Sequence, residues 1–408
     1  MESSSFLLLM SCRLLLAFTP IPLTNDLQRD HQLSSPLTSY SRLKEGLWFY
    51  QHDVDPYAGG VFRHSPLLLS LFSAVLPPVP VVWALSDMVG AWALVRIWRA
   101  RQRVNKGPSS RDSLVAAAYL LNPYLLLPSL ALSTSTFENA FVLLALMLAS
   151  DGRRSPALLA LAFSTHLSVS TFLLVLPVLM LLVTSSVSQL ASPHPFTGST
   201  WTAYQYAGEF AAYWLVLFGA ASVMAGSGWG WVHETWGASL TLPDLTPNPG
   251  LWWYFFTEMF DHFRPFFLMV FSVHLVIYIL PICIKFQHDA LYASFLLVGI
   301  LGIFKAYLSL ADPGLFLSMF VLFPEVYPYL RYPIVTTLLH THASLLLPIF
   351  HALWVTEGRG NANFYYAASL VMGVAGGAGV VDACFAGLRI AMGDIAQGER
   401  GKWEVVQE

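Results

Sequence analysis

Long apolar stretches separated by short polar loops recur along the whole chain and limit the folds that are open to it. The 408 residues include only 21 Lys and Arg and 24 Asp and Glu, so 11% are charged, against about 25% in soluble domains. So few charges cannot cover the exterior of a soluble protein that is 56% hydrophobic. The sequence therefore excludes a cytosolic enzyme, a disordered tail and, with a net charge of -3, a nucleic-acid binder. It predicts an all-α polytopic membrane protein.

A helix needs about 20 apolar residues to cross about 30 Å of hydrocarbon. On this basis we expect about a dozen hydrophobic segments, several of them short or interrupted by proline. Short, broken apolar helices are typical of backbone that lines a protected cavity. The predicted segments are 7–18, 67–76, 78–98, 114–132, 137–150, 157–164, 167–183, 207–225, 266–284, 291–310, 315–323, 334–353 and 364–390.

Basic residues gather in the loop between segments 78–98 and 114–132, which predicts the orientation of the chain. Basic residues close to the ends of membrane spans stay in the cytosol. The residues that this rule places in the cytosol are Arg96, Arg99, Arg101, Arg103, Lys106, Arg111, Arg153, Arg154, Lys285, Arg400 and Lys402. The polar stretches that then lie together on the luminal side are 24–64, 226–250, 309–314 and 356–362.

The same reasoning predicts four parts of the chain. They are a membrane anchor at 1–20, a luminal loop at 21–65, a multi-span domain at 66–393 and a cytosolic tail at 394–408. No phosphate-binding glycine loop, dinucleotide fingerprint or zinc-protease motif occurs, so no cofactor is predicted. His340 and His342 are two residues apart, so on a helix they point to different faces and cannot share a metal ion.

Asp53 and Asp55 form an acidic pair in the predicted luminal loop. Two carboxylates one residue apart can hold a divalent metal or act as a base near a sugar-phosphate donor. The alternative is that both are solvated turn residues, since Pro56 and Gly59-Gly60 follow closely.

Residues 242–263 combine a stretch that is rich in proline with an aromatic block that follows it. Three prolines and a glycine predict a rigid turn over 243–250, with a helix starting near Pro249. On that helix Tyr254, Glu258 and His262 would recur at helical spacing. Glu258 and His262 either bind a polar lipid head or belong to an interfacial anchor, because ionisable groups at membrane depth are costly.

Lys305 and an asparagine pair are further candidates on the luminal side. Lys305 lies near the end of an apolar span, where it can extend to the surface, meet a lipid phosphate or pair with Asp312. Asn361 and Asn363 can donate amide hydrogen bonds to phosphate oxygens or sugar hydroxyls. The alternative for this pair is capping of the last long helix.

These stretches together resemble the PIG-U family, the multi-span subunits of glycosylphosphatidylinositol (GPI) transamidase. The resemblance runs from about Ser35 to Arg389. Its most specific carriers are Pro243-Asp-Leu-Thr-Pro-Asn, the aromatic block through His262-Phe263, and Asn361-Ala-Asn-Phe. Weaker carriers are Pro56-Tyr-Ala-Gly-Gly-Val-Phe and Leu121-Asn-Pro-Tyr. Leu-Ser follows Tyr307 where the family pattern has Pro-Thr, which weakens any role for that loop.

The resemblance implies a noncatalytic scaffold in the endoplasmic reticulum membrane, with the architecture of the GT-C glycosyltransferases. Its partners would be PIG-K (the caspase-like catalytic subunit), PIG-S, PIG-T and the GPI attachment protein, together with the GPI lipid. By position, Asn361 and Asn363 would contact the GPI headgroup. The predicted lipid-binding set is Asn248, Glu258, His262, Lys305, Asn361 and Asn363.

Two other functions remain open at this point. A GT-C mannosyltransferase that uses dolichol-phosphate-mannose would need Asp53 or Asp55 as its base. A transporter is less favoured, because the sequence has few paired intramembrane charges and no visible inverted repeat.

Overall fold

Helices form all the regular secondary structure in the part of the chain that the structure describes. The computed structural model describes residues 4–19, 24–74, 79–102, 111–184, 190–226 and 228–393. The predicted all-α class is therefore confirmed for these residues. Arg103, Lys106, Arg400, Lys402 and the predicted tail 394–408 lie outside them.

Five helical stretches are long and apolar enough to cross a membrane among the described residues. They are α5 (Val79–Arg101), α11 (Thr200–Met224), Asp261–Lys285, Pro333–Thr356 and α20 (Ala362–Met392). The stretch Asp261–Lys285 consists of η3 (Asp261–Phe263), α15 (Arg264–Val276) and α16 (Ile279–Lys285), and Pro333–Thr356 consists of α19 (Pro333–His351) and η6 (Ala352–Thr356).

A bent pair of helices makes a sixth candidate span if it is taken as one crossing. The pair is α6 (Asp112–Leu120) and α7 (Pro123–Leu130), which meet at an angle of 54°. The bend occurs at Asn122, whose side chain caps α7 by accepting a hydrogen bond from the Tyr124 amide at 3.0 Å. Because Pro123 has no N–H to donate, it suits the first position of a new helix better than the continuation of the old one.

The other predicted apolar segments form helices that are shorter than a full span. These are α1 (Ser4–Leu16), α4 (Pro66–Ala74), α8 (Ser135–Ser150), α9 (Arg154–Leu167), η1 (Val169–Leu174), α10 (Val175–Thr184), α17 (Ala290–Phe304) and α18 (Ala311–Met319). The remaining elements are α2 (Thr24–Arg29), α3 (Tyr40–Gln51), α12 (Gly230–Val232), η2 (His233–Gly237), α13 (Ala238–Thr241), α14 (Trp252–Thr257), η4 (Phe320–Leu322) and η5 (Pro324–Tyr329).

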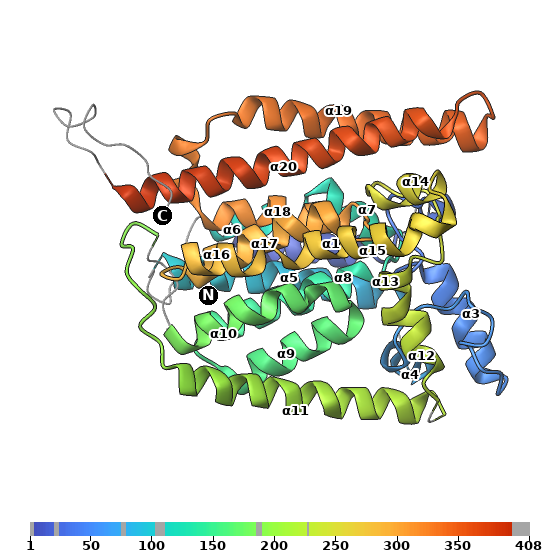
Figure 1. The fold of residues 1–408 in the computed structure, drawn as a ribbon, viewed down its shortest axis with the longest axis horizontal. Coiled ribbons are helices and arrows are strands. Elements are labelled where there is room, and N and C mark those ends of the chain that lie inside the picture. The colour runs from blue at the N-terminus through green and yellow to red at the C-terminus, as the bar shows by residue number, and fades with distance from the viewer. Residues whose placement is uncertain are drawn as a thin grey trace.

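The longer helices run roughly along one direction, with α17 in the centre (Figure 1). Every residue of α17 from Ala290 to Ile303 is buried, and the helix packs against α10, α18 and α20. The helices α19 and α20 lie side by side along one edge, and α11 runs along the opposite edge (Figure 1). The predicted span 291–310 is too long, because the helix ends at Phe304 and Lys305 adopts an extended conformation.

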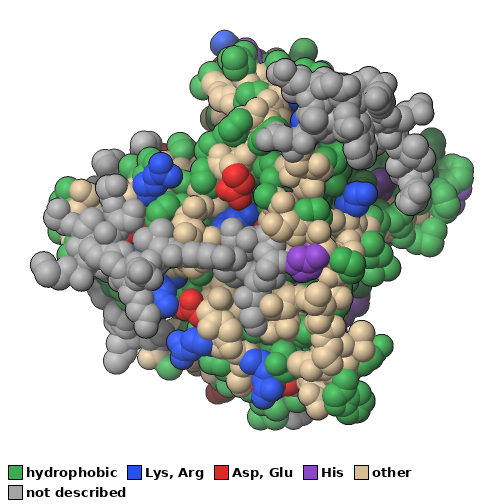
Figure 2. All heavy atoms as spheres, turned by 90° about the vertical axis from the view of Figure 1, so that its left-hand side faces the viewer, with side chains coloured by type: hydrophobic (Ala, Val, Ile, Leu, Met, Phe, Trp, Pro, Cys, Tyr) green, Lys and Arg blue, Asp and Glu red, His purple; other side chains and the backbone are tan. Residues whose placement is uncertain are grey.

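Ion pairs gather at the end of the bundle where Figure 1 marks the chain termini. Figure 2 shows basic and acidic side chains together on this end. Arg96 contacts Asp151 at 2.8 Å, and Arg101 contacts Asp289 at 2.8 Å and Glu325 at 2.6 Å. Among the described basic residues that we expect in the cytosol, those paired with acidic neighbours are Arg96, Arg99, Arg101 and Arg154.

The four polar stretches that were predicted to share one side meet at the other end of the bundle. Arg42 contacts Asp244 at 2.8 Å, and Arg63 contacts Glu234 at 2.8 Å, which joins the stretches 24–64 and 226–250. The amide of Leu310 donates to the Gln32 carbonyl at 2.9 Å, which adds the stretch 309–314. The rings of His31 and His351 lie 6.5 Å apart, close to the turn at 356–362.

The predicted N-terminal anchor is held inside the bundle by a buried ion pair. Arg13 of α1 is 3% exposed and contacts Asp87 of α5 at 2.7 Å and Ser129 at 2.6 Å. The helix is 13 residues long and packs against α5 and α6. The charge within this apolar segment therefore has a structural partner.

Candidate lipid-binding site

The proline-rich loop before the aromatic block is fixed at its start by an acidic residue. Leu242 ends α13 with φ +48°, and Asp244 then accepts hydrogen bonds from the Thr246 amide at 2.9 Å and from Arg42 at 2.8 Å. Burial alone would raise the pKa of Asp244, but these hydrogen bonds and the Arg42 charge lower it. A lowered carboxyl pKa means that the contact stabilises the fold at neutral pH and is lost in acid.

Asn248 is buried and uses its side chain within the same loop. It is 1% exposed, donates to the Thr246 carbonyl at 3.1 Å and accepts from the Gly250 amide at 2.8 Å. Of the predicted lipid-binding residues, Asn248 therefore shapes the loop that precedes α14.

The aromatic block forms a helix that is shorter than predicted. The helix α14 covers only Trp252–Thr257, and Glu258 ends it. The chain then turns at Phe260 and starts η3, so Glu258 and His262 do not share one continuous helix. Proline is tolerated in the first turn of a helix but not in its interior, so Pro265 requires a new helix, α15.

The first part of the aromatic block is core rather than surface. Trp252 and Trp253 are 1% and 2% exposed, and the Trp252 indole donates to the Phe304 carbonyl at 3.0 Å. In contrast, Glu258 and His262 are exposed, and the His262 ring lies 4.0 Å from that of Phe263. The last part of the block therefore faces outward, with the exposed rings of Phe260 and Phe263 beside Glu258 and His262.

The asparagine pair meets the aromatic block across the fold. The Asn361 side-chain oxygen caps α20 by accepting hydrogen bonds from the amides of Asn363, at 3.0 Å, and Phe364, at 3.4 Å. The Tyr254 hydroxyl donates to the side-chain oxygen of Asn363. Both asparagines are exposed, and their amide nitrogens donate to no protein group within the described ranges. Capping and lipid binding are therefore compatible, because they use different atoms.

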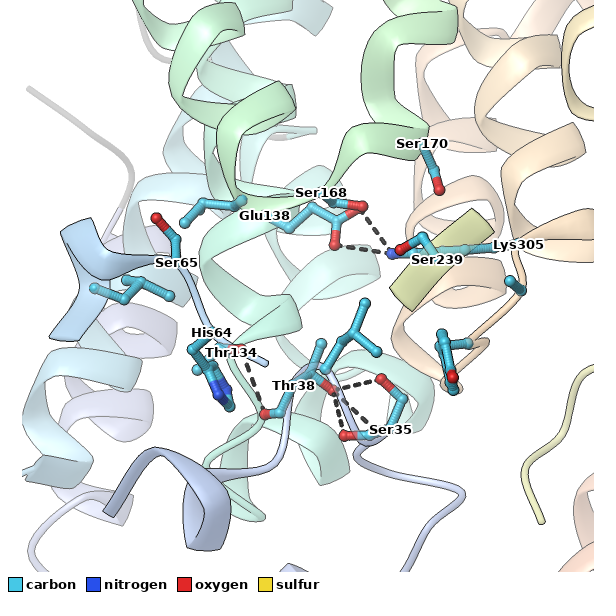
Figure 3. A pocket seen from close by; sticks show the side chains of 15 residues that line it. Ser35, Thr38, His64, Ser65, Thr134, Glu138, Ser168, Ser170, Ser239 and Lys305 are labelled. Atoms are coloured by element: carbon cyan, nitrogen blue, oxygen red, sulfur yellow. Dashed lines mark hydrogen bonds and ion pairs between the residues drawn. The ribbon is translucent and has the colours of Figure 1, made fainter. Parts of the chain in front are cut away.

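Lys305 lies in a buried cluster of three charges. Its ammonium contacts Glu138 and Asp312, each at 2.8 Å, and the three residues are 7–8% exposed. Figure 3 shows Lys305 directed toward Glu138 across a small polar pocket, which also contains Ser168 and Ser239. The cavity there measures about 30 Å³, enough for one or two water molecules. The pairing with Asp312 that the sequence left open is present, and Lys305 does not extend to the surface.

Sequence reasoning missed Glu138 as the second partner of Lys305. The signal was available, because Glu138 is the acidic residue of the otherwise apolar segment 137–150. An ionisable residue in such a segment is costly unless it is paired, so an oppositely charged partner is expected. Spacing along the chain could not supply that partner, since 167 residues separate the two.

A polar pocket lies beside His31, on the same end of the bundle as the asparagine pair. It has a volume of about 170 Å³, and Arg29, His31 and Arg42 line it together with the hydroxyl groups of Ser39 and Ser41. His31 faces His351, and the His351 ring lies 5.3 Å from Tyr365 of α20. Because the Arg42 guanidinium is paired with Asp244, the groups suited to a phosphate are the Arg29 guanidinium and the two hydroxyls.

An apolar cavity of about 320 Å³ lies between α4, α5, α8 and α9. Leu68 and Leu167 line both this cavity and the small polar pocket beside Lys305. Apolar walls of this kind suit a lipid chain.

The acidic pair Asp53 and Asp55 lies apart from these cavities. Both are exposed, Asp53 has φ +56°, and the Asp55 carboxylate accepts from the Tyr57 amide at 2.9 Å. Asp55 therefore acts as a turn residue.

The resemblance to the PIG-U family implies a role in GPI attachment. On that basis we expect the Asp53→Ala/Asp55→Ala double variant to retain attachment within about twofold of the natural chain, because it removes less than about 1 kcal/mol of local hydrogen bonding. GPI attachment is measured in microsomes from cells that lack the natural chain and express the variant. A large loss of attachment would assign the pair a chemical role.

Comparison with known proteins identifies the family. The family model described as "GPI transamidase subunit PIG-U" matches residues 7–372. The chain is 32% identical over 372 residues to "GPI transamidase component GAB1" of Saccharomyces cerevisiae, covering 90% of each protein. It is 31% identical over 372 residues to "GPI-anchor transamidase component PIGU" of Homo sapiens, covering 84% of each. The chain therefore belongs to the family of the GPI transamidase subunit PIG-U.

Proposed function

We propose that this chain is a noncatalytic subunit of GPI transamidase that holds the complex together and presents the GPI lipid to it. The observation that carries the proposal is the exposed Asn361–Asn363 turn, fixed against Tyr254 with both amide nitrogens directed to no protein partner in the described ranges. In this proposal the amides bind the sugar hydroxyls or phosphates of the GPI headgroup. Neutral amides suit this task because they donate hydrogen bonds without the desolvation cost of a charge.

Three other features support the proposal. The pocket lined by Arg29, His31 and Arg42 offers the charge of Arg29 for a lipid phosphate on the same end of the bundle, since Arg42 is paired with Asp244. Glu258 and His262 are exposed at the end of the aromatic block, where a polar head or an amine can reach them. Lys305 and Asn248 act indirectly in this view, since both are buried and engaged.

The outward faces of several helices support a role in assembly. In the apolar windows of α11, Asp261–Lys285 and α19 with η6, only 17%, 6% and 17% of the residues are buried within the chain. Such faces are covered by lipid or by the spans of partner subunits. We propose that the chain lies in the endoplasmic reticulum membrane with a GT-C-like architecture of about a dozen segments, and that it assembles with PIG-K, PIG-S, PIG-T and the GPI attachment protein. The mannosyltransferase alternative is not favoured, because Asp53 and Asp55 are exposed turn residues.

The test separates lipid binding by Asn361 from its capping of α20. Asn361→Asp keeps a side-chain oxygen for the cap but removes the amide donor and adds a negative charge. We expect this variant, Asn361→Ala and the Asn361→Ala/Asn363→Ala double variant to lower GPI attachment roughly tenfold while the complex still assembles. Attachment is measured in microsomes, and assembly by affinity purification in mild detergent.

The matched control is Arg359→Ala in the same turn, whose side chain is 80% exposed and carries no amide. We expect attachment to remain unchanged in this variant. If Asn361→Asp attaches GPI as well as the natural chain while Asn361→Ala does not, capping is the only role of Asn361 and the proposed binding role is wrong.

A further inference from the structure

A second cavity lies between the α19–α20 pair and the rest of the bundle, away from the asparagine turn. Its volume is about 390 Å³, and α7, α18, α19 and α20 contribute its walls. Gly379 of α20 lines it and follows Asn361 by about 18 residues, which corresponds to about 27 Å along the helix. This cavity is therefore separate from the site proposed for the GPI headgroup.

Two buried polar side chains face this cavity without a hydrogen-bond partner. His340 is 8% exposed, lines the cavity, and neither of its ring nitrogens has a partner among the described residues. The Thr336 hydroxyl, one turn away on α19, is also buried and unpartnered. Each unsatisfied buried polar group costs about 1–3 kcal/mol, so two of them beside one cavity favour a bound polar group there.

The other polar groups of the cavity are already engaged. The Tyr124 hydroxyl is hydrogen-bonded to Ser344, and the Ser344 hydroxyl also donates to the His340 carbonyl at 2.6 Å. The Asp382 carboxylate accepts from the backbone amides of Arg331 and Tyr332 at 2.7 and 3.0 Å. Among the described side chains that line the cavity, only His340 and Thr336 therefore have polar atoms with no partner at all.

The charge of the lining restricts the chemistry of that ligand. Asp382 lines the cavity, whereas no Lys or Arg does so within the described chain. The nearby Arg331 guanidinium instead lies over the Phe385 ring, 3.5 Å from its centre. An anionic headgroup would meet a carboxylate without a compensating cation. A neutral hydroxyl fits better, because it can donate to one group and accept from the other, as imidazole and threonine require.

The depth of the two side chains agrees with a lipid hydroxyl. Thr336 and His340 lie about 4.5 Å and about 10.5 Å along α19 from its first residue, Pro333. Arg331 and Arg389 mark this end of the α19–α20 pair, as expected for residues at a membrane surface. A lipid whose hydroxyl lies just below that surface could place its apolar body against Leu317 and Phe320.

We infer that the cavity between α18, α19 and α20 binds a neutral membrane lipid with a single hydroxyl, held by Thr336 and His340. A sterol and a diacylglycerol both have this chemistry. The site would join the α19–α20 pair to the bundle through a lipid, in addition to the direct contacts.

The inference can be tested by photocrosslinking in native membranes that contain the full complex. Three clickable, photoactivatable probes are compared: a sterol, a diacylglycerol and phosphatidylserine. The labelled chain is purified, the bound label is quantified, and the crosslinked peptides are mapped. We expect one neutral probe to label peptides within residues 317–382, with competition by the same unlabelled lipid.

Two variants remove the site by different means. Gly379→Leu fills the cavity, since a Cβ there would lie 3.5 Å from Phe316 and 3.6 Å from Thr336. Thr336→Val removes one hydroxyl at nearly constant shape. We expect labelling to fall at least fivefold in Gly379→Leu and about threefold to fivefold in Thr336→Val. The matched control is Gly377→Leu, because no atom lies within 4 Å of a Cβ at that position.

The outcome decides both the site and its occupant. Loss of labelling in Gly379→Leu and Thr336→Val but not in Gly377→Leu supports the inference, and the probe that labels identifies a sterol or a diacylglycerol. Equal labelling in all variants, preferential labelling by phosphatidylserine, or no labelling of these peptides by any probe would overturn it. Co-purification of the partner subunits shows that each variant has folded.

Discussion

Replacement of Lys305 by Met is expected to lower the free energy of unfolding by about 3–5 kcal/mol. The variant leaves the carboxylates of Glu138 and Asp312 buried together without the ammonium that now lies 2.8 Å from each. Removing one partner of a buried ion pair costs more than the pair contributes, because the remaining charge is neither solvated nor neutralised. The expected result is a much lower melting temperature of the detergent-solubilised complex and a lower steady-state level in membranes.

Two further variants distinguish this explanation from a general effect of losing a basic residue. Arg359→Met removes an ion pair with Glu357 in which nitrogen and oxygen are 3.8 Å apart and the arginine side chain is 80% exposed. Since solvent screens such a pair, we expect stability to be unchanged. Adding Glu138→Gln and Asp312→Asn to Lys305→Met removes the stranded charges and should restore most of the lost stability. If the triple variant is as unstable as Lys305→Met alone, the charge argument is wrong.

Replacement of Arg101 by Met is expected to have a comparable effect at the other end of the bundle. Arg101 is 1% exposed and contacts Asp289, which is fully buried, and Glu325. It thereby ties α5 to the start of α17 and to η5, three elements that are far apart in the sequence. We expect a loss of about 3–5 kcal/mol, because Asp289 would keep its charge in a buried position.

The control for Arg101 is Arg96→Met on the same helix. The Arg96–Asp151 pair has a similar length, 2.8 Å, but Arg96 is 44% exposed. Solvent screens such a pair, so the variant should change stability by no more than about 1 kcal/mol. Thermal unfolding of the two variants side by side measures the difference, and equal effects would show that burial is not the cause.

Apolar length alone was sufficient to predict most of the long helices. The segments 78–98 and 334–353 correspond closely to α5 and α19, because a long apolar run must be covered by lipid or by other helices wherever it lies. The polar stretches that were assigned to one side also meet at one end of the bundle. The number of crossings between two stretches and the positions of the basic loops predict which stretches share a side, without any knowledge of side-chain contacts.

Helix ends and long-range partners could not be predicted in the same way. The helix expected through Glu258 and His262 ends at Thr257, and the span expected to reach residue 310 ends at Phe304. The contacts of Lys305 with Glu138 and Asp312 depend on how α8, α17 and α18 pack, which periodicity does not determine. For Asn361 the sequence leaves capping and lipid binding as alternatives, whereas in the structure the oxygen caps the helix and the nitrogen is available to a ligand.

The length of α20 has a consequence for how its first turn meets a bilayer. Its 31 residues extend about 46 Å, whereas hydrocarbon is about 30 Å thick. Even at a steep inclination of about 40°, the helix would span about 36 Å of depth, so roughly one turn must project into the zone of choline, sugar and phosphate groups. A continuous helix that is longer than the hydrocarbon core is thick can place the Asn361 cap in the headgroup region, at the level of glycolipid heads, without any movement of the surrounding loops.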